Sequence, residues 1–288
     1  MVQNEAVTAP TPVGDPGVRE IGVPVSTLWA AAAPPGERLS QLLMGEPVLV
    51  LEERGGWSHV AALWQGSSRH ERGYPGWVRT AHLASHVDRP DGPKAHVDRL
   101  RVTCSLAGGA AVELSLGTVL PVDSVGDRTV TVCLPGGRRG DLPTSCVRLS
   151  GNRGEPADDA TAALEAAREF LGLGYLWGGT SAWGIDCSGL VHLAWRSRGV
   201  LLPRDAHDQA EARQVADVPL DDVRSGDLYF FARPGRPIHH VGMATGPLLD
   251  DGTRWMLHAP ESGALVEEAP LAPHRHETLV AAGRVTGG

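Results

Sequence analysis

The sequence predicts two small all-β barrels followed by an α+β domain. From residue 21 to about residue 85, short apolar strands alternate with glycine-containing turns, and residues 96–149 repeat this pattern with weaker signals. Beyond residue 150, helical spacing of apolar residues gives way to a run of strands, as in an α+β domain. The 288 residues, 42% hydrophobic and 21% charged, are enough for two or three packed domains.

We divide the chain into four parts: a polar tail (1–20), a first barrel (21–88), a second barrel (89–150) and the α+β domain (151–288). The tail lacks the apolar core of a secretory signal, so we expect a cytoplasmic protein. No run approaches the ~18 apolar residues that a membrane span needs. The net charge of −8 argues against nucleic acid as a partner.

In the first barrel we expect strands at residues 47–51 and 57–60, joined by a turn at 52–56, and a tight turn and strand at 73–78. In the second barrel we expect strands at 118–122, 129–132 and 146–149, with a turn at 136–140. We interpret 88–94 as a linker and 151–156 as the next boundary. A helix should begin at Asp158 and Asp159, reach about Leu171 and stop at Gly172.

The main chemical feature is the glycine-rich stretch 175–190, YLWGGTSAWGIDCSGL, which places Cys187 at a loop-to-helix junction. Free N–H groups and the dipole at a helix start favour negative charge, so we expect a lowered thiol pKa. Such a nucleophile needs a base, normally a histidine from elsewhere in the chain. The backbone N–H of Cys187 and the side chain of Tyr175 are candidates for stabilising an oxyanion.

The candidate bases are His240 and His258, which lie on two consecutive predicted strands, 240–245 and 255–258, after a strand at 228–231. If these strands are neighbours, one imidazole can act as the base and the other can orient it. Alternation along a strand should turn His239 to the opposite face from His240. His192 is poorly placed on the helix after Cys187, and we expect His207 at the surface.

The four cysteines, Cys104, Cys133, Cys146 and Cys187, contain no C-x-x-C pair, so we predict no metal site. A reactive Cys187 would leave an odd number, which argues against a disulfide framework.

The β segments and the cysteine–histidine order each resemble a known family. The sequences LMGEPV (43–48), GW (56–57) and GYPGWV (73–78) are similar to a bacterial SH3-like domain, and residues 96–149 look like a diverged second copy. The order Cys, His, His resembles the NlpC-type cysteine peptidases of bacterial cell-wall metabolism, which have a papain-like fold. That resemblance runs through YLWGG (175–179), DCSGL (186–190), LPRD (202–205), Gln209, GDL (226–228), HVG (240–242) and HAP (258–260).

The resemblance implies an α+β papain-like catalytic domain preceded by two SH3-like barrels. In that family pattern Cys187 is the nucleophile, His240 the base and His258 the third polar member, and no cofactor is needed. The domain order is similar to that of γ-D-glutamyl-L-diamino acid endopeptidases of murein peptide recycling. In that group the first SH3-like domain closes one end of the cleft and holds the free N-terminal L-Ala of a murein peptide. The matching positions are Glu46, Tyr74, Tyr175, Asp186, Ser188 and Asp205; Ala206 replaces a frequent serine.

Several alternatives stay open. Asp186, Ser188 and Asp205 could simply cap helices, and Trp177 and Trp183 could be core residues instead of a substrate platform. The same chemistry could belong to a secreted hydrolase of intact wall, with the barrels as wall-binding modules. A third possibility is a binding protein with a decayed catalytic domain, against which the intact cysteine and two histidines argue.

Overall fold

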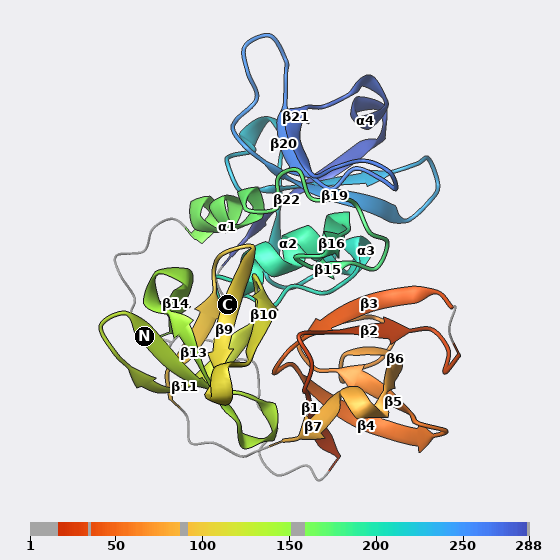
Figure 1. The fold of residues 1–288 in the computed structure, drawn as a ribbon. Coiled ribbons are helices and arrows are strands. Elements are labelled where there is room, and N and C mark those ends of the chain that lie inside the picture. The colour runs from red at the N-terminus through yellow and green to blue at the C-terminus, as the bar shows by residue number, and fades with distance from the viewer. Residues whose placement is uncertain (1–16, 34–35, 87–91, 151–158, 287–288) are drawn as a thin grey trace, which may run out of the picture.

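The computed structural model describes residues 17–33, 36–86, 92–150 and 159–286. Their strands form two seven-stranded sheets, a two-stranded sheet and a six-stranded sheet, with helices beside the last (Figure 1). The predicted boundary at 151–156 and the predicted cap Asp158 lie outside the described residues, as does most of the predicted linker at 88–94. None of the helices in the described ranges is long and apolar enough to cross a membrane.

The first sheet, here called the first β segment, has the strand order β3-β2-β6-β5-β4-β1-β7. Its strands are β1 (Val18–Ile21), β2 (Val25–Trp29), β3 (Arg38–Leu43), β4 (Pro47–Arg54), β5 (Trp57–Ala62), β6 (Tyr74–Arg79) and β7 (Leu83–Ser85). Strand β1 begins inside the stretch predicted as a tail, because Val18 pairs with Leu49 of β4. The predicted turn between β4 and β5 is confirmed but shorter, with Gly55 and Gly56 at positive φ.

The second sheet, the second β segment, has the order β10-β9-β13-β12-β11-β8-β14. Counted from its own first strand, this is the same order as in the first sheet. Its strands are β8 (Lys94–Val97), β9 (Arg101–Leu106), β10 (Ala111–Ser115), β11 (Val119–Val125), β12 (Thr129–Cys133), β13 (Arg139–Pro143) and β14 (Val147–Leu149). The two segments therefore share a topology although their sequence signals differ in strength.

The remaining elements carry the predicted Cys187, His240 and His258 and are here called the catalytic region. Its helices are α1 (Asp159–Arg168), α2 (Cys187–Arg196), α3 (Ala206–Ala210) and α4 (Pro273–Thr278). Its strands are β15 (Thr180–Ser181), β16 (Gly184–Ile185), β17 (Val215–Val218), β18 (Leu228–Ala232), β19 (Ile238–Ala244), β20 (Trp255–His258), β21 (Glu267–Pro270) and β22 (Leu279–Val285). The large sheet has the order β17-β22-β18-β19-β20-β21. Helix α1 ends three residues before the predicted Leu171.

Alternation along β18 and β19 gives the large sheet two apolar faces. On one face, side chains such as Phe230, Val241 and Met243 pack in one core cluster with the α1 and α2 helices. On the other face, Tyr229 and Phe231 pack in a second cluster. The sheet is thus buried on both sides, which holds the strands that carry the histidines in fixed positions.

Both β segments contribute to the core around α2. Leu43 of β3 and Leu116, just after β10, are fully buried in the cluster that contains α2. Gly117 has a φ of +85°, and a Cβ there would lie 2.8 Å from a methyl group of Leu193 on α2. Glycine is therefore required where the second segment approaches the catalytic helix.

Candidate active site

Cys187 is the first residue of α2, as predicted, and only 7% of it is exposed. The preceding Asp186 is the N-cap: its carboxylate accepts hydrogen bonds from the backbone N–H groups of Gly189 at 2.8 Å and Gly178 at 2.9 Å. Gly189 is needed because a Cβ there would overlap the carbonyl oxygen of Gly179. The glycine-rich stretch thus folds tightly around the helix start and fixes the thiol.

The thiol pKa is raised, which corrects the lowered value that the helix start predicts. Burial is the main cause, and the neighbouring carboxylate of Asp186 adds to it, so that the pKa of Cys187 rises to about 11. The backbone N–H groups of Val241 and Ser188 and the charge of Arg204 act in the opposite direction but are outweighed. At neutral pH the thiol therefore keeps its proton, and its activation requires a base.

The two predicted imidazoles meet. Nε2 of His240 on β19 lies 2.8 Å from Nδ1 of His258 on β20, and the residues are 3% and 6% exposed. His239 is exposed whereas His240 is buried, and the register of β18 and β19 shifts at this point, so the opposite face expected for His239 stays a prediction. Gly242 makes the pair possible, because a Cβ there would overlap the side chain of Met256 and come within 3.0 Å of the His258 Cβ. The backbone N–H of Val241, the residue after His240 on β19, donates a hydrogen bond to the Cys187 thiol.

Both imidazoles are held neutral. Burial lowers the pKa of His240 well below its usual range, and the nearby guanidinium of Arg275 lowers it further. Burial and Arg275 likewise lower the pKa of His258 to about 3. A neutral imidazole has one donor and one acceptor nitrogen. If Nε2 of His240 donates to His258, its Nδ1 is the acceptor that a base requires.

Glu267 of β21 extends this chain of side chains, and sequence reasoning missed it. Its Oε1 lies 3.4 Å from Nε2 of His258, its cross-strand neighbour. The carboxylate favours a proton on that nitrogen, which leaves Nδ1 of His258 as acceptor for the His240 N–H. Only the pairing of β20 with β21 brings Glu267 to this position, so no local motif indicates it.

Tyr175 lies near the thiol. Burial raises the pKa of its hydroxyl, and the adjacent Cys187 raises it further. Its backbone N–H is fixed by the carbonyl of Ala264 at 2.9 Å. A phenol that keeps its proton beside the nucleophile is suited to donate to an oxyanion.

Asp186 and Ser188 lie in a buried polar network centred on Arg204. The Arg204 guanidinium binds both carboxylate oxygens of Asp186, at 2.7 and 3.0 Å, and the hydroxyl of Ser188 at 2.9 Å. Its Nε donates to Ser40 of the first β segment at 2.9 Å. The capping role of Asp186 is thus confirmed. Direct contact of Asp186 or Ser188 with a substrate stays a prediction.

Asp205 meets Tyr74 at the junction with the first β segment. The hydroxyl of Tyr74 donates to the Asp205 carboxylate at 3.0 and 3.2 Å, and the guanidinium of Arg69 lies 3.7 Å away. Asp205 occupies the N-cap position of α3, but its side chain makes no capping hydrogen bond. Its carboxylate points instead to the first β segment, as the resemblance implies.

No hydrogen bond joins Glu46 to Asp205 or Tyr74 among those described. Glu46 is 1% exposed, and its carboxylate binds the buried Arg196 of α2, the backbone N–H of Leu43 at 2.9 Å and the amide of Gln65 at 3.3 Å. Glu46 therefore anchors the first β segment to α2, and its contact with a substrate stays a prediction.

The comparisons with known proteins agree with this site. The sequence profile of the NlpC/P60 family matches residues 172–284, and that of the bacterial dipeptidyl-peptidase Sh3 domain matches residues 28–83. A gamma-D-glutamyl-L-lysine dipeptidyl-peptidase of Bacillus subtilis (strain 168) is 36% identical over 254 residues, 85% of this chain and 80% of that protein. The chain belongs to the NlpC/P60 family. It is a cysteine peptidase.

Two further relatives of this NlpC/P60 peptidase support the same conclusion. A gamma-D-glutamyl-L-lysine dipeptidyl-peptidase of Bacillus cereus (strain ATCC 10987 / NRS 248) is 32% identical over 81% of the peptidase and 70% of the relative. The crystal structure of an NlpC/P60 family protein from Bacillus cereus ATCC 10987 superposes with a TM-score of 0.84 at 28% identity. It covers 93% of the peptidase and 99% of that chain.

The structure also shows how exposed the two tryptophans are and where the cysteines and possible metal ligands lie. Trp177 and Trp183 are 60% and 40% exposed, which excludes the interpretation of them as core residues. All four cysteines are free thiols. Among the described residues one cluster, Asp205, His207 and Asp208, has the spacing of metal ligands. The Tyr74 hydroxyl and the Ser68 N–H already bind its carboxylates, so nothing marks it as a metal centre.

Proposed function

We propose that the peptidase hydrolyses the bond between γ-D-Glu and a diamino acid in murein peptides that carry a free N-terminal L-Ala. The observation that carries this proposal is the pairing of Asp205 with Tyr74 at the junction with the first β segment. Two of the relatives are named as gamma-D-glutamyl-L-lysine dipeptidyl-peptidases, an activity that releases a dipeptide from a chain end. Such an enzyme must recognise that end.

A free amino terminus is a cation at neutral pH and needs an acceptor-only group as its partner. Asp205 provides one. Its salt-bridge partner among the described residues is the half-exposed guanidinium of Arg69, at the long distance of 3.7 Å. The incoming ammonium would take that place, while the Tyr74 hydroxyl holds the carboxylate in position. An N-blocked peptide loses this ion pair and leaves the carboxylate without its cation.

The reaction then follows from the neutral thiol and imidazole. His240 takes the thiol proton as the sulfur attacks the γ-carbonyl carbon of D-Glu, and Tyr175 donates to the oxyanion. The tetrahedral species collapses, the C–N bond breaks, and the proton on His240 passes to the leaving amine. Water, deprotonated by His240, attacks the thioester, and the released thiolate recovers the proton. The products are L-Ala-γ-D-Glu and a peptide that begins with the diamino acid.

Two further expectations belong to this proposal. The identical strand order of the two β segments supports a second, diverged SH3-like barrel that arose by duplication. Action on small, free-amine peptides would fit murein peptide recycling in the cytoplasm. Fractionation of cells that produce the tagged protein tests the location, and recovery outside the cytoplasm would favour the wall hydrolase.

The decisive experiment compares L-Ala-γ-D-Glu-L-Lys with its N-acetylated form. We expect kcat/KM for the blocked peptide to be about 100-fold lower, the scale of one lost charged contact. Asp205→Asn should slow the free-amine peptide far more than the blocked one, while Asp217→Asn, which changes an exposed carboxylate on β17, serves as the control. Equal rates of the wild type on both peptides would refute the proposed end recognition.

A further inference from the structure

Arg275 of α4 is a buried cation beside the catalytic histidines, whose pKa values it lowers. It is 8% exposed. Its Nη2 donates to the carbonyl of Pro260, two residues after His258, at 3.3 Å. Its guanidinium lies 5.6 Å from the ring centre of Phe231, which in turn lies 5.5 Å from the ring of His240. Arg275 thus reaches the catalytic pair from the α4 side of the sheet.

Among the described residues Arg275 has no carboxylate partner within 4 Å, and its one hydrogen bond is that of Nη2 to Pro260. Burial lowers its pKa, and the nearby Cys187, Glu261 and Glu267 act in the opposite direction. A partly buried charge without a close counter-ion is costly. Its Nε and Nη1 are not among the buried atoms without a partner, so these donors are accessible to an anionic ligand.

Arg204 provides the contrast. It also lies near the thiol and is almost fully buried, but Asp186 neutralises it through two short contacts. Asp205, at the proposed amine site, also raises the pKa of Arg204. Glu261 and Glu267 raise that of Arg275 against the effect of burial, and Glu267 lies beside His258. Arg204 thus has a bound carboxylate, whereas Arg275 has none within 4 Å among the described residues.

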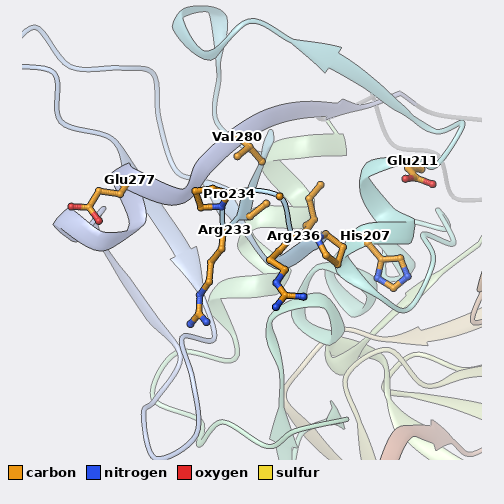
Figure 2. A pocket seen from close by; sticks show the side chains of 11 residues that line it. His207, Glu211, Arg233, Pro234, Arg236, Glu277 and Val280 are labelled. Carbon is orange, nitrogen blue, oxygen red and sulfur yellow. The ribbon is translucent and has the colours of Figure 1, made fainter.

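Two further arginines lie on the surface near Arg275. Burial lowers the pKa of His239, and the positive charges of Arg275 and Arg233 lower it further. Arg233 and Arg236 belong to the β18–β19 turn and line a pocket of about 510 Å³ between α3, this turn and the start of β22. Figure 2 shows both arginine side chains extending in the same direction, with His207 on one side and Glu277 of α4 on the other. Glu211 also lines this pocket, so its two arginines are balanced by two carboxylates.

We propose that Arg275 binds a carboxylate of the leaving diamino acid. This inference rests on the proposed function, which places L-Ala and γ-D-Glu between Asp205 and Cys187 and the leaving residue beyond the thiol. In Figure 1, α4 lies across the catalytic sheet from the first β segment, which agrees with a position on the leaving side. Two carboxylates share this chemistry: the α-carboxylate of a C-terminal diamino acid and a carboxylate at the end of its side chain.

The test compares wild type and Arg275→Gln on four free-amine peptides. They are L-Ala-γ-D-Glu-L-Lys, the same peptide with an L-Lys amide, the meso-diaminopimelate peptide with its α-carboxyl amidated, and L-Ala-D-isoglutaminyl-L-Lys, which lacks only the D-Glu carboxylate. We expect wild-type kcat/KM to be about 10- to 100-fold higher where the leaving residue carries a carboxylate. Arg275→Gln should reduce the ratio of kcat/KM between the carboxylate-bearing substrates and the L-Lys amide to about one, because the amide has no carboxylate for Arg275. This ratio is independent of any change in absolute rate that follows from the histidine pKa values.

Arg236→Gln is the matched control, since it removes an exposed positive charge from the neighbouring turn and should keep the preference. The inference would be overturned if Arg275→Gln kept the full preference for a leaving residue with a carboxylate. An equal fall in kcat/KM on all four peptides would also overturn it, because it would indicate a structural role for Arg275. A selective loss tied to the D-Glu carboxylate would also overturn it. Failure of the wild type to distinguish free from N-acetylated peptides would instead overturn the proposed function. The two failures are therefore separable.

Discussion

The two β segments share one strand order but contact the catalytic region in different ways (Figure 1). The first segment reaches it with buried side chains: Tyr74 binds Asp205, Ser40 binds Arg204, and Glu46 binds Arg196. The second contacts mainly its backbone: Arg101 binds the carbonyl of Ala182, Ser115 accepts from the Ala182 N–H, and Arg148 binds the carbonyl of Ser197. Topology alone therefore does not give a segment a part in the site; a few side chains do.

The contacts with Arg204 and Asp205 distinguish the two segments. The first segment binds Arg204, which holds Asp186 at the start of α2, and it binds Asp205, whereas the second segment binds Ala182 and Ser197. Each segment also has a contact at the end of α2, Glu46 with Arg196 and Arg148 with Ser197, which can affect stability. The following variants test whether the two segments differ in their effect on the substrate.

The largest stability effect should come from Glu46→Gln in the first segment. Glu46 is the only carboxylate partner of the buried Arg196 among the described residues, so the change leaves an uncompensated charge. We expect the free energy of unfolding to fall by about 3–5 kcal/mol. Urea denaturation measures this, with the exposed Glu113→Gln of the second segment as the control, expected to change stability by less than about 0.5 kcal/mol. Similar small losses in both variants would show that the Glu46 anchor has no energetic role.

Glu46 also shows what the sequence can and cannot predict. Cys187, His240 and His258 were predictable because a helix start and strand alternation are local patterns and their order along the chain is characteristic. The partner of Glu46 lies on α2, and no local pattern links the two residues. Strand β3 was missed for a related reason: Ser40 and Gln41 are polar but buried, because they bind Arg204 and Thr180.

Local sequence patterns also could not predict the electrostatics of the site. The helix start at Cys187 predicts a lowered thiol pKa, but burial and Asp186 reverse the sign. The position of Arg275 beside the histidines could not be predicted from the sequence, because it depends on how α4 packs against β18. Sequence patterns thus indicate which residues react, while their protonation states and partners depend on the assembled fold.

A second prediction concerns acid stability, which should depend more on the second segment. Burial lowers the pKa of His96 in β8 to about 3, below its usual value of 6.5. Between these values the unfolded chain binds a proton that the folded protein does not, so stability is lost as the pH falls below 6.5. His96→Gln should reduce this loss by about 1.4 kcal/mol per pH unit.

The measurement is the unfolding free energy between pH 6.5 and 4.5. His82→Gln in the first segment is the matched control, because burial also lowers the pKa of His82 and the charge of Arg79 lowers it further. An unchanged slope in His96→Gln, or a larger change in His82→Gln, would contradict the assignment. His192 and His258, both with a pKa of about 3, should contribute in the same direction in all variants.

The smallest effect should come from Arg69→Ala. The Arg69 guanidinium is half exposed and 3.7 Å from Asp205, so its ion pair is weak. Because it competes with the substrate ammonium, its removal should lower KM for free-amine peptides by at most about fivefold. Steady-state kinetics give KM, and Arg101→Ala of the second segment should leave it unchanged. A rise in KM for Arg69→Ala would mean that Arg69 assists binding.

The most direct test of the central claim, that only the first segment forms part of the substrate site, pairs Tyr74→Phe with Ser115→Ala. Each change removes one hydroxyl that bonds to the catalytic region. The measurement is the ratio of kcat/KM for L-Ala-γ-D-Glu-L-Lys to that for its N-acetylated form. We expect Tyr74→Phe to lower this ratio about tenfold or more, since a hydrogen bond to a charged group is lost, and Ser115→Ala to leave it unchanged. An unchanged ratio in Tyr74→Phe, or an equal fall in both variants, would contradict the account.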